Sequence, residues 1–147
     1  MILQIVLILF IGIAGALALP KAISDLGATW PLVMLGATAM ALGAWIVWSA
    51  TRGLGDSFTA LPRPHQDAIL VQDGLYARIR HPIYAGVMCL GLGWAAVTQS
   101  LPAWIAAVAL TVVLDLKARR EEFWLAERYP AYPDYRSRTH RFLPGLY

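Results

Sequence analysis

Four apolar runs, separated by shorter polar stretches, dominate the chain. They cover Ile2–Leu19, Trp30–Ala50, Pro82–Thr98 and residues 101–116. A helix needs about 20 predominantly apolar residues to cross the hydrocarbon core of a bilayer, and somewhat fewer where its ends lie near the headgroups. Hydrophobic residues make up 59% of the 147 residues, whereas charged residues make up 14% and largely avoid the runs. The pattern predicts an all-α membrane protein with four transmembrane helices, formed as a single domain over residues 1–147.

Prolines and one short polar turn indicate where the runs begin and end. Pro20 is expected to end the first run, and Pro31 suits the first turn of the second helix, where a missing N–H costs nothing. Only Gln99 and Ser100 separate the last two runs, which must therefore form an antiparallel helical hairpin. The first run also resembles a signal peptide. A retained helix is favoured, because the run is long and no Lys or Arg precedes it.

Basic residues are unevenly distributed between the polar stretches. The linker 51–81 and the tail 117–147 hold Arg52, Arg63, Arg78, Arg80, Lys117, Arg119, Arg120, Arg128, Arg136, Arg138 and Arg141, whereas the 20–29 loop holds only Lys21. Because loops rich in Lys and Arg stay on the cytoplasmic side, the sequence predicts a multi-pass protein with its linker, its tail and both termini in the cytoplasm. This orientation and the attraction of anionic headgroups account for the net charge of +3 better than nucleic acid does.

Several kinds of site lack the residues that they need. The single cysteine, Cys89, lies within an apolar run, which excludes an internal disulfide, and no Cys/His spacing typical of a metal site is present. The sequence contains no Gly-rich phosphate loop and no nucleophile elbow. The expected partners are therefore membrane lipids, with neither metal nor nucleic acid among them.

Small residues recur at helical spacing within the runs. The pairs are Gly12/Ala16, Gly36/Gly43 and Gly86/Gly93. Small residues allow the backbones of membrane helices to approach closely, so these positions predict helix–helix contacts. Gly86 lies one turn inside a polar cluster, where a missing side chain could also make room for a ligand.

Two polar clusters border the predicted hairpin at the same end. The first holds Tyr76, Arg78, Arg80, His81 and Tyr84, and the second runs from Lys117 to Glu122. Ionisable groups at the edge of a membrane helix are costly to place and usually mark a functional site. The two clusters therefore predict one pocket, open to water, at a membrane face.

The chemistry of these residues leaves alternatives open. His81 precedes a proline, so it lies on a non-helical bend, and Tyr84 lies one turn further on, where its hydroxyl needs a partner. Lys117 and Glu121 share one helix face and could serve a polar cofactor and an anionic group. They could equally belong to a ladder of surface ion pairs beside an interfacial histidine and tyrosine. Asp115 is expected to be solvated, and the Tyr- and Arg-rich tail is either an interfacial anchor or a lid.

The two clusters together resemble a known family. The residues that carry the likeness are Leu70-Val71, Gly74-x-Tyr76, Arg80-His81-Pro82-x-Tyr84-x-Gly86, Glu121-Glu122-x-x-Leu125, Tyr132, Arg141 and Pro144. This pattern, over about residues 53–145, is similar to that of the isoprenylcysteine carboxyl methyltransferases and the related phospholipid N-methyltransferases. The resemblance implies an integral membrane methyltransferase that uses S-adenosylmethionine and a lipid-like or small apolar acceptor, with a cofactor pocket on the cytoplasmic side.

The resemblance also implies roles for individual residues. The cofactor-binding set is Ala68, Ile69, Leu70, Val71, Tyr76, His81, Pro82, Ile83, Tyr84 and Glu121. The isoprenylcysteine enzymes carry an arginine one turn before the glutamate, on the substrate side, and here that residue is Lys117. Lys117 and Glu121 are therefore the candidate catalytic residues. A lysine cannot grip a carboxylate bidentately, so this departure affects the acceptor more than the cofactor.

Two other functions compete with methyl transfer. Membrane sterol reductases, which use a nicotinamide cofactor, have a similar Arg-His-Pro-x-Tyr-x-Gly motif, but theirs usually has Asn after the proline and an acidic residue after the glycine. This chain has Ile83 and Val87 there. A non-enzymatic membrane protein would use both polar clusters only as headgroup anchors. Titration with each cofactor, and substitution of His81 and Glu121, would separate the three hypotheses.

Overall fold

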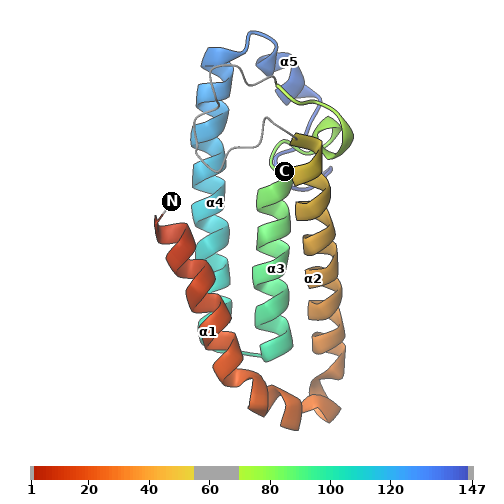
Figure 1. Ribbon diagram of the computed structural model, residues 1–147, viewed down its shortest axis with the longest axis vertical. Helices are drawn as coiled ribbons and strands as arrows, with labels where there is room; N and C mark the ends of the chain where they lie inside the picture. Colours follow the sequence, from red (N-terminus) through yellow and green to blue (C-terminus); the bar gives the residue numbers. More distant parts are fainter. Residues whose placement is uncertain (1, 55–69, 146–147) are drawn as a thin grey trace. The chain divides into compact units, whose positions relative to one another are not determined.

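The computed structural model describes residues 2–54 and 70–145, which are helical apart from short connections (Figure 1). The helices are α1 (Ile2–Ser24), α2 (Leu26–Leu54), α3 (Pro82–Thr98), α4 (Leu101–Arg128) and α5 (Tyr132–Ser137), with a 3₁₀-helix, η2 (Gly74–Ala77), before α3. Within these residues, extended pairing is limited to a single parallel bridge between Ile79 and His140. The all-α prediction is confirmed.

In the part of the chain that the structure describes, three helices are long and apolar enough to cross a membrane, namely Ile2–Ser24, Thr29–Leu54 within α2, and Leu101–Arg128. At about 1.5 Å per residue, each exceeds the roughly 30 Å of a hydrocarbon core. α3 is equally apolar but shorter, at 17 residues. The prediction of an integral membrane protein therefore stands, whereas the count of four spans stays a prediction.

The predicted ends of the first two helices are wrong. Pro20 lies inside α1, and α2 begins at Leu26, so Pro31 is also an interior residue rather than part of the first turn. The predicted loop 20–29 shrinks to Asp25, whose N–H donates to the carbonyl of Lys21 at 3.0 Å. Membrane helices tolerate such prolines because neighbouring groups and local adjustments satisfy the freed backbone.

Contacts divide the chain into two compact units. The first comprises Met1–Trp45 and Gly86–Leu114, and the second comprises Ile46–Ala85 and Asp115–Tyr147. α2, α3 and α4 therefore each contribute residues to both units. The prediction of one domain over residues 1–147 stays a prediction.

The first unit is built on close contacts between glycines of α2 and α3. A Cβ atom added to Gly36 would lie 2.6 Å from the carbonyl oxygen of Gly93, and one added to Gly43 would lie 2.7 Å from that of Gly86. The predicted packing role is confirmed for these glycines, and Gly86 packs against α2. The prediction is wrong for Gly12, because a Cβ there would meet no heavy atom of the described chain within 4 Å.

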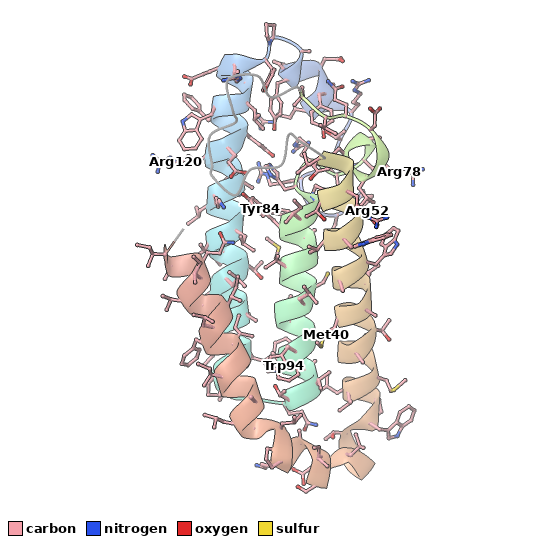
Figure 2. The ribbon with its side chains drawn as sticks, viewed as in Figure 1. Met40, Arg52, Arg78, Tyr84, Trp94 and Arg120 are labelled. Atoms are coloured by element: carbon pink, nitrogen blue, oxygen red, sulfur yellow. The ribbon has the colours of Figure 1, made fainter. Side chains whose placement is uncertain are left out.

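The contact on α1 lies instead at Gly15, where an added Cβ would clash with the indole of Trp94 on α3, a residue labelled in Figure 2. The same unit contains the predicted hairpin. α3 ends at Thr98 and α4 begins at Leu101, so the two-residue turn is confirmed. Gln99 adopts a positive φ of 53° in this turn and donates through Nε2 to Oγ1 of Thr29 at 2.7 Å.

Candidate functional site

The second unit brings the His-Pro segment against the end of the chain. His81 precedes Pro82, which disfavours helical angles and keeps this residue outside α3. The backbone there forms a short parallel ladder. The N–H of Arg80 donates to the carbonyl of His140 at 2.8 Å, that of His140 to the carbonyl of Arg78 at 2.9 Å, and that of His81 to the carbonyl of Arg141 at 3.1 Å. The ladder fixes the backbone from which the imidazole projects.

The imidazole of His81 lies between two carboxylates. Its Nδ1 lies 3.7 Å from Oε2 of Glu121, and its Nε2 lies 3.4 Å from Oε1 of Glu122. Neither contact is a well-aligned hydrogen bond, and Nε2 is buried without such a partner among the described residues. The ring stacks on Tyr84, with centroids 5.4 Å apart and planes 4° from parallel, and Phe142 packs at 6.1 Å. The ring is therefore held by packing, with each nitrogen facing a different carboxylate.

Glu122 is the centre of a buried ion cluster. Its carboxylate accepts from Nε of Arg80 at 3.0 Å and from Nε and Nη2 of Arg141, each at 3.0 Å. Nη1 of Arg141 also donates to Asp115 at 3.1 Å. Only 3% of the Glu122 side chain is exposed. Two guanidinium groups thus face two carboxylates, which is the arrangement that makes buried charges tolerable.

This cluster overturns two expectations. Asp115 is not simply solvated, because it pairs with both Arg119 and Arg141. The segment from Lys117 to Glu122 is not an ordinary surface ladder either, since Glu122 is buried. Sequence reasoning placed the two arginines in the family pattern without giving them a role. The signal that could have found it is the need of a buried guanidinium for a carboxylate.

Glu121 has a different environment from its neighbour. Its Oε1 accepts a hydrogen bond from the hydroxyl of Tyr84 at 2.6 Å, which satisfies the phenol that the sequence left in need of a partner. The Tyr84 side chain comes from the first turn of α3 (Figure 2). Nζ of Lys117 lies 5.0 Å from the centroid of the Tyr84 ring. A carboxylate offers about four lone-pair sites, so Glu121 retains acceptor capacity that Glu122 has spent on arginines.

Two buried tyrosines link η2, which precedes the site in the sequence, to α5. The hydroxyl of Tyr135 on α5 donates to the backbone carbonyl of Tyr76 at 2.7 Å. Burial raises the pKa of Tyr76 well above its usual value and that of Tyr135 to about 12. Both phenols are therefore neutral at physiological pH and act as hydrogen-bond donors or packing groups rather than as bases.

The structure gathers some of the predicted site residues and leaves others apart. His81, Tyr84, Lys117 and Glu121 come together in the second unit. Tyr76 is held by α5, and Pro82 and Ile83 form the first turn of α3. Leu70 and Val71 are half-buried in irregular backbone before η2, and Ala68 and Ile69 lie outside the described residues. Among the described residues, no group of three or more His, Cys, Asp or Glu could hold a metal ion.

Comparisons with known proteins give one family model and two curated relatives. A family model of phospholipid methyltransferases matches residues 31–132. The cobalt-zinc-cadmium resistance protein CzcN of Cupriavidus metallidurans is 35% identical over 78 residues, which are 52% of this chain and 36% of that protein. The nickel-cobalt-cadmium resistance protein NccN of Alcaligenes xylosoxydans xylosoxydans is 32% identical over 114 residues, which are 77% of this chain and 48% of that protein. The chain thus matches less than half the length of either curated relative.

The fold also matches a solved structure. The eukaryotic intramembrane Ras methyltransferase, an isoprenylcysteine carboxyl methyltransferase, superposes with a TM-score of 0.74 over 92% of this chain and 52% of that chain. The sequence identity is 22%. At that identity the likeness shows a shared membrane fold.

Proposed function

The chain belongs to the phospholipid methyltransferase family, and from that premise we propose that it is a membrane enzyme that transfers a methyl group from S-adenosylmethionine to a lipid-like or small apolar acceptor. The observation that carries the proposal is the convergence of His81, Tyr84 and Glu121 within hydrogen-bonding or stacking distance. Glu121 lies 37 residues from Tyr84 in the sequence, yet its partly buried carboxylate shares one site with the two aromatic rings.

The residues present fit the proposed cofactor. S-adenosylmethionine supplies an electrophilic methyl group on a positively charged sulfur, together with hydroxyl and amino groups that donate hydrogen bonds. Glu121 has acceptor capacity for such donors, and its negative charge suits a cation. The Tyr84 ring stacks on His81 and lies under the ammonium of Lys117, so the site already brings a cation to an aromatic face. We assign the cofactor to these three residues and to Tyr76, Pro82 and Ile83, with residues 68–71 completing the set.

Glu121 and Glu122 would divide the work between them. Glu122 is occupied by two arginines, so it positions the site rather than exchanging a proton. Glu121 faces the ligand. Methyl transfer from a sulfonium needs no covalent enzyme intermediate, and its rate depends on an in-line approach of the acceptor to the methyl group. The structure of the site would therefore contribute mainly orientation.

Lys117 bears on the choice of acceptor. Its ammonium lies over the Tyr84 ring on the same helix face as Glu121, where the resemblance places the substrate. A point positive charge there would favour an acceptor with an anionic group, such as a carboxylate or thiolate, which is already nucleophilic near neutral pH. An ammonium acceptor would instead need a base to remove its proton, and Glu121 and His81 are the groups placed to supply one.

The proposed topology rests on the distribution of basic residues. We place the linker, the tail and the cofactor pocket on the cytoplasmic side, because those segments hold every Lys and Arg except Lys21. A polar cofactor would then enter from the cytoplasm and a lipid-like acceptor from the bilayer. Labelling of single cysteines introduced in the 20–29 region and the tail, in sealed vesicles, tests this placement.

Calorimetric titration of the detergent-solubilised protein with S-adenosylmethionine tests the function. We expect Glu121→Gln to weaken binding by roughly tenfold to a hundredfold, because a hydrogen bond to a charged group contributes about 1.5–3 kcal/mol. Glu127→Gln is the matched control, since Glu127 is an exposed glutamate of the same helix. Absence of binding by the folded wild-type protein would refute the proposal. Binding of a nicotinamide cofactor instead would favour the reductase hypothesis.

A further inference from the structure

A second site, unrelated to the polar clusters, lies in the first unit. A groove of about 620 Å³ runs between α1 and the turn that joins α3 to α4. Its wall on α1 is apolar and consists of Phe10, Ile13, Ala14, Leu17 and Ala18. These positions recur every three or four residues and therefore form one stripe along the helix. The next turn of the same stripe carries Lys21, about 16 Å from Phe10 along the helix axis.

The polar side chains that line the groove are those of Lys21, Gln99 and Ser100. The Ser100 hydroxyl donates to the carbonyl of Ala14 at 3.1 Å, in the middle of the stripe, so the charged end of the groove is marked by Lys21. Lys21 is the only Lys or Arg in residues 2–45 and 86–114, and its ammonium forms no ion pair among the described residues. Gln99 keeps a φ of 53°, a region that residues other than glycine rarely adopt. Its amide donates to Thr29, which holds the side chain in place beside the groove.

The groove has an apolar wall and a charged end, which correspond to the acyl chain and the headgroup of a phospholipid. An apolar stripe of several turns ends at Lys21, a cation that has no ion-pair partner within residues 2–54 and 70–145. A lysine in the last turn of a helix also interacts with the helix dipole and with headgroups in general, but that role needs no groove. Basic pockets between membrane helices are typical sites for anionic headgroups. The volume is within the range of pockets that hold small molecules.

We propose that this groove binds one anionic phospholipid of the surrounding bilayer, with its phosphate at Lys21 and Gln99 and one acyl chain along the α1 stripe. The cation and the apolar stripe would each contribute, so headgroup charge and chain would both matter. The groove shares no residue with the ion cluster or with the proposed cofactor set. The lipid is therefore a separate ligand from the methyl acceptor.

Native mass spectrometry of the purified full chain, equilibrated in detergent with equal amounts of phosphatidylglycerol and phosphatidylcholine, tests the proposal. We expect the wild-type protein to retain the anionic lipid preferentially. Lys21→Gln should reduce that preference by about fivefold, the factor expected for one basic residue at a lipid surface. Lys21→Arg should restore it. Ala18→Trp, which fills the stripe, should reduce retention of both lipids.

Arg52→Gln provides the matched control, because Arg52 also lies in the last turn of an apolar helix but outside the groove. The proposal is overturned if wild type and Lys21→Gln retain the two lipids in the same ratio, or if Arg52→Gln lowers the ratio as much as Lys21→Gln does. Binding of S-adenosylmethionine, measured in parallel, should be unchanged in Lys21→Gln. Absence of S-adenosylmethionine binding by the wild-type protein would count against the proposed function, but it would leave the lipid result unaffected.

Discussion

Replacement of Glu122 by glutamine should lower the stability of the protein far more than replacement of Glu121 does, although the two residues are adjacent. The Glu122 carboxylate accepts three hydrogen bonds of 3.0 Å from two guanidinium groups and is 3% exposed. A glutamine would leave both arginines without that counter-charge. Breaking a buried pair in this way typically costs about 3–5 kcal/mol. Whole domains are stable by only about 5–15 kcal/mol, so the loss would be a large fraction of the total.

The same change at Glu121 has a different expected effect. Its side chain is 16% exposed, and the carbonyl of a glutamine can still accept the hydrogen bond from Tyr84. We expect a loss of about 1 kcal/mol or less, the size of an ordinary hydrogen bond. Ligand binding should nevertheless weaken, because the variant lacks the charge that we propose to face the ligand. Glu122→Gln should therefore lose mainly stability, whereas Glu121→Gln should lose mainly ligand binding.

Thermal unfolding in detergent, followed by tryptophan fluorescence, measures the first effect. Glu122→Gln should lower the midpoint by roughly 10 °C, at about 2–4 °C per kcal/mol for a chain of this size, whereas Glu121→Gln and the exposed control Glu127→Gln should lower it by a few degrees at most. Equal midpoints for Glu121→Gln and Glu122→Gln would refute the reasoning. So would a Glu122→Gln protein of normal stability that fails to bind S-adenosylmethionine, since that carboxylate would then contact the ligand.

Two further predictions concern packing and pH. Gly43→Ala should destabilise the first unit by about 1–3 kcal/mol, because its Cβ would lie 2.7 Å from the Gly86 carbonyl, whereas Gly12→Ala should be neutral or slightly stabilising; thermal midpoints of the two variants check this. Burial raises the pKa of Tyr135 from 10.0 to about 12. The unfolded state therefore loses the phenol proton at a lower pH than the folded state does, and stability should fall as the pH rises from about 10 to about 12. Tyr135→Phe should flatten that decline in alkaline unfolding curves and cost about 1–3 kcal/mol at neutral pH, because the Tyr76 carbonyl loses its donor.

The sequence predicted those parts of the structure that local rules determine. Two residues between apolar runs leave only a hairpin, and that hairpin carries Tyr84 and Glu121, whose side chains meet. The helix ends near Pro20 and Pro31 were wrong, because proline signals from water-soluble proteins weaken inside membrane helices. Gly12 also failed as a packing site, since a small residue permits close contact but does not require it.

The parts that the sequence could not supply depend on contacts between distant residues. Nothing in the neighbourhood of Glu122 shows that it differs from Glu121, because the difference comes from Arg80 and Arg141, which lie 42 and 19 residues away. The parallel ladder from residue 78 to residue 141 has no local signature either, since each strand is only a few residues long. Such contacts follow from the assembled fold rather than from periodicity or propensity.

The pairing of residues 78–81 with residues 139–141 has a consequence for how the protein is made. During synthesis, the helices can enter the bilayer in order as they leave the ribosome, before residue 139 exists. The imidazole, by contrast, cannot be fixed until that late segment arrives and closes a loop of about 60 residues, a slow step relative to helix formation. Membrane insertion and completion of the proposed site are therefore separate events, and a chain stalled before residue 139 would be embedded without the backbone that fixes His81.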